Sequence, residues 1–234
     1  MKIHTFITGA SSGIGKGIAE ALLNEGTTVT GLQRRAGLSQ PGYNHHELDL
    51  SNRNALEKFT FTGDPEAQRW VLINNAGTIG EVKPVQGLSA KATEHAFFLN
   101  LTAPVILTQK FLDACHSHQK EAVVINISSG AAAYAIPSWS TYCASKAALE
   151  QFTQVLHTDH PEVGCLAISP GIVDTEMQDA IRSSNAEDFP EHERFVNYKK
   201  QGDLQSPAEV GKKIATFALH PEKAPGVSFS LRDI

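Results

Sequence analysis

Short apolar runs alternate with amphipathic stretches along most of the chain. Runs such as TTVTGL, RWVLINN, EAVVINIS and GCLAIS are almost continuously hydrophobic, which is typical of strands buried on both faces of a sheet. KIHTFITG, HHELDL and GVSFSL supply three more strand-like segments. After the first of these, apolar residues recur at helical spacing before Gly26 ends the pattern, at Ile14, Ile18, Ala21 and Leu22. The alternation predicts an α/β fold, with one doubly wound, seven-stranded parallel sheet covered by helices on both faces.

Local signals predict where several helices begin and end. Ser51 is expected to cap a short helix. Residues 89–115 form a long helical stretch that contains Pro104, which should kink it or divide it in two. Ser206 and Glu209 have the spacing of a capping box at the start of a later helix.

The chain is expected to form a single domain over residues 1–234, because it contains no linker, repeat or low-complexity tract. One long region, residues 174–205, is polar and lacks a clear period. Long irregular segments in compact domains are often functional. We therefore expect this region to be a lid over a site rather than a passive connection.

Composition and charge narrow the range of functions. The net charge is −5 and the isoelectric point is near 6.0, which argues against a nucleic-acid partner, since phosphate binding needs clustered Lys and Arg. No apolar run approaches the length of a membrane span, and the first residues do not resemble a signal peptide. A cytoplasmic location is the resulting expectation.

Cysteine and histidine usage favours neither a disulfide framework nor a metal site. The three cysteines, Cys115, Cys143 and Cys165, include no C-x-x-C pair and are interpreted as reduced packing residues. Cys143 follows a tyrosine, but no histidine nearby in sequence is placed to activate it as a nucleophile. The ten histidines are scattered, so no metal is expected.

A glycine-rich turn, TGASSGIGKG, lies between the first strand and the first helix. In a doubly wound sheet this is where a helix N-terminus binds the pyrophosphate of a dinucleotide. Gly9, Gly13 and Gly15 do not follow the G-x-G-x-x-G pattern, because Ile18 stands where its third glycine would fall. The sequence predicts a dinucleotide site here, the alternative being a turn that only starts a helix.

The segment YCASK places Tyr142 and Lys146 four residues apart in a predicted helix over residues 141–157. This spacing brings the two side chains to one face, where they can reach a common ligand. A tyrosine can act as a proton donor, but with a pKa of about 10 a free tyrosine is a weak one near neutral pH. A nearby ammonium favours tyrosinate, so we expect Lys146 to lower the pKa of Tyr142 and make it an acid/base group.

Five motifs together resemble the short-chain dehydrogenase/reductase family over nearly the whole chain. They are TGxxxGxG at 8–15, NNAG at 74–77, the spacing of thirteen from Ser129 to Tyr142, YCASK, and SPG at 169–171. The resemblance implies a Rossmann-type fold and an NAD(P)-dependent oxidoreductase that acts on CH–OH or C=O groups. It also implies a homodimer or homotetramer, because family members commonly pair through the helix that carries the tyrosine and lysine and the helix after it.

The resemblance assigns roles to four residues. Tyr142 would exchange the proton, Lys146 would tune it and hold the nicotinamide ribose, and Ser129 would bind the carbonyl oxygen. Ser128 is the rival for the last role, and spacing favours Ser129. Asn100, in FFLNLTA, resembles the residue thought to hold a water on the proton path.

The end of the second strand reads GLQRR, and it favours NADPH over NAD. Gln33 occupies the position where family members that use NAD commonly carry aspartate. Arg34 follows and can pair with a 2′-phosphate, whereas Arg35 also fits a solvated loop residue. The resemblance implies the following cofactor contacts: Gly9, Ser11, Ser12, Gly13, Ile14, Gly15, Arg34, Asp49, Leu50, Asn74, Ala76, Gly77, Tyr142, Lys146, Pro170, Gly171, Ile172 and Thr175.

Within the family, INNAGTIG and the tract from residue 174 to 214 resemble the branch that contains sepiapterin reductase and bacterial benzil reductases. Sepiapterin reductases carry an aspartate in the last strand that anchors the pterin, and Ser230 stands there. Tyr134, Trp139 and Met177, together with Ser129 and Tyr142, are expected around the substrate, although ordinary packing under the lid also explains the first three.

A small-molecule ketone or diketone, aromatic or pterin-like, is the expected substrate. Two other functions remain open: an NAD-linked alcohol dehydrogenase of the same family, and a non-catalytic protein that senses NADP. All four residues of the catalytic set are present, which favours the enzyme.

Overall fold

The computed structural model describes residues 1–234, and it confirms the predicted fold class. Seven parallel strands form one sheet in the order β3-β2-β1-β4-β5-β6-β7. Their bounds are β1 (Ile3–Thr8), β2 (Thr28–Gln33), β3 (Tyr43–Glu47), β4 (Arg69–Asn74), β5 (Glu121–Ile127), β6 (Gly164–Ser169) and β7 (Ser228–Ser230). The strand order reverses between β1 and β4, so a crevice is expected at their carboxyl ends.

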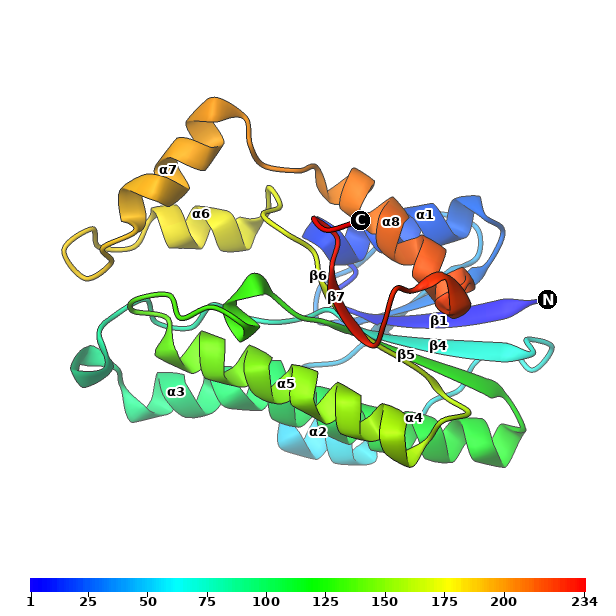
Figure 1. The fold of residues 1–234 in the computed structure, drawn as a ribbon. Coiled ribbons are helices and arrows are strands. Elements are labelled where there is room, and N and C mark those ends of the chain that lie inside the picture. Colours follow the sequence, from blue (N-terminus) through cyan, green and yellow to red (C-terminus); the bar gives the residue numbers. More distant parts are fainter.

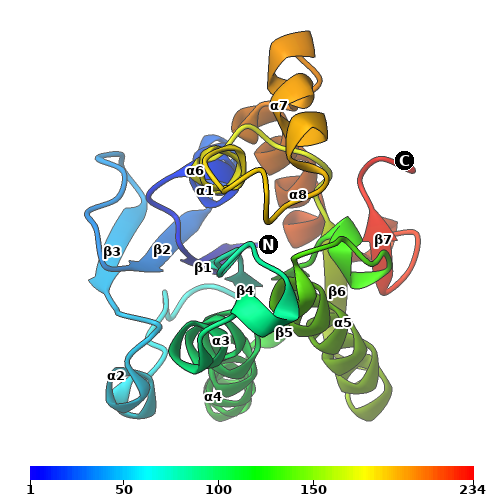
Figure 2. The same ribbon diagram turned by 90° about the vertical axis from the view of Figure 1, so that its left-hand side faces the viewer.

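Helices cover both faces of the sheet (Figures 1 and 2). Helices α1 (Gly13–Asn24) and α8 (Pro207–Leu219) lie on one face, and α3 (Ala90–Phe97), α4 (Ala103–His118) and α5 (Ser140–Asp159) lie on the other. The short α2 (Arg53–Lys58) flanks α4. Two buried hydrophobic clusters, of 21 and 18 residues, fill the two sides of the sheet. No helix of the structure has the length and apolarity that crossing a membrane would require.

Helices α1 and α8 contact each other through glycine. A Cβ on Gly17 would lie 2.2 Å from the carbonyl oxygen of Pro207, and a Cβ on Gly211 would lie 2.3 Å from the carbonyl carbon of Gly17. These neighbours are backbone atoms, which do not move as a flexible side chain does. The two glycines therefore set how closely the helices approach.

We predict that Gly17→Ala lowers the free energy of unfolding by ~1–3 kcal/mol, the usual penalty for overpacking. Alanine has the higher helix propensity, so without the clash the same change would stabilise the helix by up to ~1 kcal/mol. Urea unfolding followed by circular dichroism measures the difference. Gly226→Ala is the matched control, because a Cβ there has nothing within 4 Å. A Gly17→Ala protein as stable as wild type would contradict the packing described.

The predicted cap of α2 is wrong by one residue. The Asn52 side chain, not that of Ser51, caps the helix by accepting a hydrogen bond from the Ala55 N–H at 3.2 Å. Both the N–H and the hydroxyl of Ser51 donate to Asp49 Oδ1, at 2.9 and 2.7 Å. The carboxylate therefore competes with the helix for Ser51, and the helix begins after Asn52.

The long helical stretch before β5 is divided, as predicted, and the division takes the form of a wide π-helical turn at Phe98–Thr102 between α3 and α4. Pro104 is the second residue of α4. It has no N–H to donate to the carbonyl of Asn100, four residues earlier, which explains why regular hydrogen bonding fails at this point. The turn buries the Asn100 side chain completely.

The segment over residues 174–205 is more regular than the sequence predicts. It contains α6 (Glu176–Arg182) and α7 (His192–Gln201), which lie at the end of the molecule where the strands finish (Figure 1). Phe189 and Phe195 from this segment pack on Trp139, with ring centroids 5.7 and 5.1 Å away. Tertiary packing of these aromatic rings, rather than helical periodicity in the sequence, fixes the segment.

Candidate active site

A cavity of about 420 Å³ opens at the carboxyl ends of the strands. Its walls come from the segments that follow the strands β1 to β6, and from α5 and α6. This is the crevice at which an open parallel sheet binds its ligand. The cavity extends from the glycine turn before α1 to Tyr142 near the start of α5.

The glycine turn suits an anionic ligand. Gly9 and Gly13 have φ angles of +69° and +55°, a left-handed conformation that glycine adopts without strain. Ser12 stands at the N-cap of α1 in an extended conformation, and its side chain makes no capping hydrogen bond. The first turn of α1 carries no acidic residue. The N–H groups of the helix therefore remain available, at the positive end of the dipole, to bind a phosphate.

Most of the predicted cofactor residues line this cavity. They are Gly9, Ser11, Ser12, Gly13, Ile14, Arg34, Asp49, Leu50, Ala76, Gly77, Tyr142, Lys146, Pro170, Gly171 and Thr175. The structure thus brings together segments that are far apart in the sequence.

Three predicted cofactor residues do not line the cavity. Gly15 packs beneath the turn, where a Cβ would lie 2.4 Å from the Gly9 carbonyl oxygen. The Asn74 amide lies between the sheet and α4, where it donates to Asn126 Oδ1 at 2.8 Å and to Thr108 Oγ1 at 3.3 Å. Val173 and Asn75 line the cavity instead of Ile172 and Asn74, their predicted neighbours in the sequence.

A neutral amide and two arginines stand at the end of β2. Gln33 is buried, accepts from the Ala10 N–H at 3.3 Å and donates to the Tyr43 hydroxyl at 2.8 Å. Arg34 is exposed at the cavity wall. Arg35 is not merely solvated, because it pairs with Glu176 of α6 at 3.4 Å and donates to Ser12 Oγ at 3.3 Å. No carboxylate is present at this position to repel a 2′-phosphate.

Tyr142, Ser129 and Lys146 form a cluster in the wall of the cavity, in which Ser129 is half-buried and the other two are buried. Tyr142 and Lys146 project from one face of α5 and are 6% and 5% exposed. The Lys146 ammonium donates to the carbonyl oxygen of Ile127 at 2.7 Å and lies 5.8 Å from the centroid of the Tyr142 ring. Ser129 caps a short 3₁₀ turn after β5, and its hydroxyl hydrogen-bonds to Tyr142.

Burial dominates the protonation of both groups. It raises the pKa of Tyr142 to about 12, and the hydrogen bond from Ser129 opposes this shift. It also lowers the pKa of Lys146 to about 8, against the charge of Glu150. The expectation that Lys146 lowers the pKa of Tyr142 is therefore wrong for the protein by itself. The ammonium binds a backbone carbonyl and lies beside the phenol ring, and loss of solvent outweighs its charge.

The Asn100 side chain faces the loop after β4 and does not line the cavity. Its Oδ1 accepts from the Thr78 N–H at 2.8 Å, and its Nδ2 donates to the Thr78 carbonyl at 2.9 Å and to Ser145 Oγ at 3.2 Å. Gly77 lies against it, since a Cβ there would be 3.1 Å from Asn100 Oδ1. The side chain thus holds the loop that carries Gly77 next to α5.

The predicted substrate contacts divide into two groups. Trp139 and Met177 line the cavity beside Tyr142, and Trp139 meets the Tyr142 ring edge-on at 5.7 Å. Tyr134 is 73% exposed and lies outside the cavity, so the structure does not bring it together with the other predicted substrate contacts. Sequence reasoning missed His95, Leu99, Gln178 and Ile181, which also line the cavity. Met177 and Ile181 are four apart on α6, a signal hidden by the prediction of an irregular segment.

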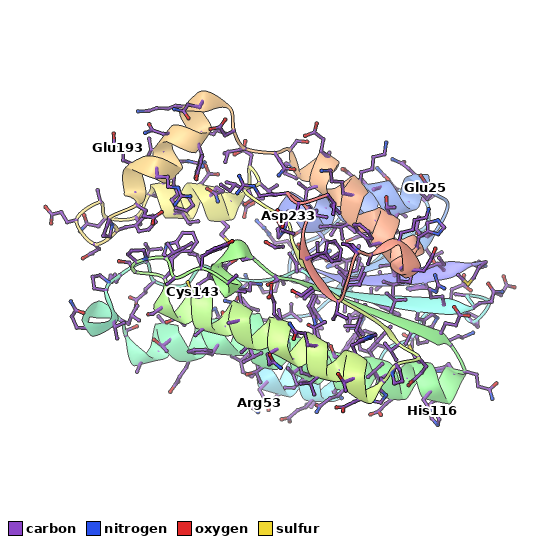
Figure 3. All side chains as sticks on the ribbon, in the orientation of Figure 1. Glu25, Arg53, His116, Cys143, Glu193 and Asp233 are labelled. Carbon is purple, nitrogen blue, oxygen red and sulfur yellow. The ribbon has the colours of Figure 1, made fainter.

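The end of α5 that carries Tyr142 is the end nearest α6 and α7. Cys143, labelled in Figure 3, marks this end, whereas Glu193 of α7 lies on the outer side of the segment. The Cys143 thiol hydrogen-bonds to the carbonyl oxygen of Tyr134 at 3.8 Å, and its side chain packs against the hydrophobic cluster that contains Trp139. This contact agrees with a packing role rather than a nucleophilic one.

Comparison with known proteins agrees with the geometry. Residues 4–186 match the family model described as short chain dehydrogenase. A benzil reductase ((S)-benzoin forming) of Bacillus subtilis (strain 168) is 38% identical over 211 residues, which cover 86% of this chain and 87% of that protein. A sepiapterin reductase of Meriones unguiculatus is 33% identical over 222 residues, covering 85% of this chain and 84% of that protein.

The solved structures include a short chain dehydrogenase/reductase from Saccharomyces cerevisiae with a TM-score of 0.84 and 27% identity, which covers 98% of this chain and 96% of that chain. The matches confirm both the predicted family and the branch with benzil and sepiapterin reductases. The chain belongs to the short-chain dehydrogenase family, and it is an oxidoreductase of that family.

Proposed function

We propose that this chain is an NADPH-dependent carbonyl reductase that acts on a ketone or diketone, with Tyr142 as the proton donor. The observation that carries the proposal is the pair of hydroxyls of the buried Tyr142 and the half-buried Ser129, in a cavity that reaches the glycine turn. Two hydrogen-bonded donors at one site suit an oxygen on which negative charge develops.

The residues of the cavity fit a dinucleotide phosphate. The glycine turn and the uncapped N-terminus of α1 would hold the pyrophosphate, and Lys146 and Thr175 would contact the nicotinamide half. Arg34 and Arg35 would pair with a 2′-phosphate. When bound there, NADPH would supply the hydride for the carbonyl carbon.

The chain's own residues would supply the proton and stabilise the charge. A pKa of about 12 keeps Tyr142 protonated at neutral pH, so it is ready to donate. Ser129 would donate a hydrogen bond to the same oxygen, and Lys146 would stabilise the tyrosinate left behind. Trp139 and the rings packed on it would keep water from the reacting oxygen.

We infer that the backbone at Asn100 contributes to proton supply. Pro104 has no N–H to donate to the Asn100 carbonyl, and this oxygen would hold a water between Lys146 and solvent. The Asn100 side chain, which is fully hydrogen-bonded, would keep the turn in place.

An aromatic diketone is the substrate that the cavity wall favours. Trp139, Met177, Leu99 and Ile181 present an apolar surface next to the hydroxyl pair. Two relatives named benzil reductase, of Bacillus subtilis and Bacillus cereus, are 38% and 36% identical. By the resemblance to sepiapterin reductases, Ser230 stands where those proteins carry an aspartate that anchors the pterin, which favours the diketone over a pterin.

We also infer that α6 and α7 act as a lid, that the chain forms a homodimer or homotetramer, and that it works in the cytoplasm. The packing of Phe189 and Phe195 on Trp139 supports the first inference, because it links the segment directly to the cavity wall. The inferred oligomer follows from the way in which members of the family commonly pair. The inferred cytoplasmic location follows from the three free cysteines.

The test is turnover of benzil, 1-phenyl-1,2-propanedione, sepiapterin and an aliphatic ketone with NADPH and with NADH. We expect the fastest reaction with NADPH and an aromatic diketone. Tight NADPH binding without turnover of any carbonyl would indicate a sensing protein. Alcohol oxidation with NAD that exceeds all reductions would indicate the NAD-linked dehydrogenase.

Arg34 is predicted to select NADPH. Arg34→Ala should raise the KM for NADPH by ~10- to 100-fold, the effect of losing a charge-assisted hydrogen bond, and leave the KM for NADH nearly unchanged. Steady-state kinetics with both cofactors measures the ratio. Lys212→Ala on α8 removes the same charge from an exposed position outside the cavity and serves as the control. An equal rise in the KM for NADPH and in the KM for NADH would contradict this role of Arg34.

A further inference from the structure

Three side chains on one face of α5 meet three consecutive residues at the end of β5. Tyr142, Lys146 and Glu150 are spaced at four-residue intervals along the helix. Tyr142 hydrogen-bonds with Ser129, Lys146 donates to the Ile127 carbonyl, and Glu150 accepts from Ser128. The first two contacts belong to the proposed catalytic cluster, and the third has no role in it so far.

We propose that Glu150 is a positioning residue of the active site, whose carboxylate fixes the segment that carries Ser129 and keeps Lys146 in its ammonium form. This inference rests on the proposed proton transfer by Tyr142.

The first part of the proposal stands on the hydrogen bonds of Ser128. Its hydroxyl donates to Glu150 Oε1 at 2.6 Å, and its side chain and backbone are only 2% exposed. Its N–H donates to the carbonyl of Ile168 in β6 at 2.8 Å. Ser128 is thus held from the helix and from the sheet, and these two contacts fix the direction in which the chain continues into Ser129.

The same contact separates the two serines chemically. With its hydroxyl hydrogen directed to Glu150, Ser128 is not free to donate to a ligand in the cavity. Ser129 is the next residue, and its hydroxyl faces Tyr142. Glu150 therefore assigns the two neighbouring hydroxyls to different partners.

The second part of the proposal concerns the charge of Lys146. The ammonium is buried, and its one hydrogen-bond partner is the neutral Ile127 carbonyl. Burial lowers the pKa of Lys146 to about 8, and Glu150 is the charged group that opposes this shift. Lys146 and Glu150 lie one helical turn apart on the same face of α5, and Tyr142, whose ring centroid lies 5.8 Å from the ammonium, is titratable but is not a carboxylate. The carboxylates Asp49 and Glu176 line the same cavity, but the pKa of Lys146 responds to Glu150 and not to them. Loss of the Glu150 charge would therefore leave the ammonium less stable.

Two substitutions separate the two contributions. Glu150→Gln keeps an oxygen acceptor for Ser128 and removes the negative charge. Ser128→Ala removes the hydrogen bond and keeps the charge. Glu150→Asp keeps the charge with a shorter reach, and Glu57→Gln, at an exposed site on α2, is the control for loss of a carboxylate.

The experiment measures kcat and KM for diketone reduction with NADPH between pH 6 and 10. An opposite charge raises the pKa of a lysine, so its removal lowers that pKa. For Glu150→Gln we expect the alkaline decline of kcat to move down by ~1 pH unit, with KM changed less than kcat. Glu150→Asp should restore the profile. Ser128→Ala should lower kcat without moving the decline, and Glu57→Gln should match wild type.

A second readout does not depend on activity. NMR of protein labelled with ¹³C at lysine Cε follows the titration of Lys146, assigned with Lys146→Arg. We expect a midpoint near the pKa of about 8 in the wild type and a lower one in Glu150→Gln. Identical midpoints and identical pH profiles would overturn the proposal, as would a Ser128→Ala protein with unchanged kcat.

The failure of this inference differs from that of the proposed function. If Tyr142→Phe is inactive while Glu150→Gln behaves as wild type in both readouts, only the role of Glu150 is wrong. If Tyr142→Phe keeps its activity, the proposed proton donor is wrong whatever Glu150 does.

Discussion

Tyr142→Phe is expected to lower kcat for ketone reduction by ~10²- to 10⁴-fold, the usual contribution of a general acid. The substitution removes the hydroxyl that would give its proton to the carbonyl oxygen. Phenylalanine keeps the edge-on contact with Trp139, so the fold should be preserved. Steady-state kinetics gives kcat, and quenching of protein fluorescence gives the Kd for NADPH, which should change little.

Tyr134→Phe is the matched control. Tyr134 lies on the same side of the molecule but is 73% exposed and outside the cavity. The kcat of the Tyr134→Phe protein should equal that of the wild type. A Tyr142→Phe protein with the activity of Tyr134→Phe would show that the proton comes from another group.

Ser129→Ala is expected to lower kcat by ~10²- to 10³-fold, as does removal of one donor from an oxyanion site. Ser129 would bind the oxygen on which charge develops, and its hydrogen bond also opposes the rise in the pKa of Tyr142. Loss of the hydroxyl therefore weakens both the binding of the oxygen and the acidity of its proton donor. Measurement of kcat/KM for one diketone compares this variant with wild type.

Ser128→Ala distinguishes the two neighbouring serines. Because Ser128 donates to Glu150 rather than into the cavity, its removal should cost far less activity than Ser129→Ala. A larger loss for Ser128→Ala than for Ser129→Ala would reverse the two roles.

The sheet could be predicted because strands buried on both faces consist of nearly continuous apolar runs, as in β4 and β5. Helices α6 and α7 could not, because they are short and polar and depend on packing. Phe189 is fully buried against Trp139, which lies 50 residues earlier, and no local sequence pattern predicts that contact. Local sequence therefore specified the core of the fold better than the segment beside the cavity.

Within the site, the sequence located Tyr142 and Lys146 well because helical periodicity fixes their relative position. It was less successful where strands end, since the direction of each side chain there depends on the exact last residue of the strand. Asn74 is the last residue of β4 and its side chain faces α4, so Asn75 takes the place in the cavity wall. Successive side chains of a strand point to opposite faces of the sheet, so an error of one residue in the predicted strand end places the wrong side chain in the cavity wall.

The pKa values of Tyr142 and Lys146 could not be predicted from the sequence. The spacing of Tyr142 and Lys146 showed that a cation is near, but not how deeply the two groups are buried. In the structure burial raises the pKa of Tyr142 to about 12 and lowers that of Lys146 to about 8. The contact of Glu150 with Ser128, 22 residues away, was equally invisible to sequence reasoning.

The most direct test of the account is a crystal structure of the protein with NADP and the alcohol product of an aromatic diketone. The account predicts that the alcohol oxygen lies within hydrogen-bond distance, ~2.6–3.2 Å, of both the Tyr142 and the Ser129 hydroxyls, with the pyrophosphate at the glycine turn. An alcohol bound away from these hydroxyls, or a Tyr142 hydroxyl turned to bulk solvent in that complex, would contradict it.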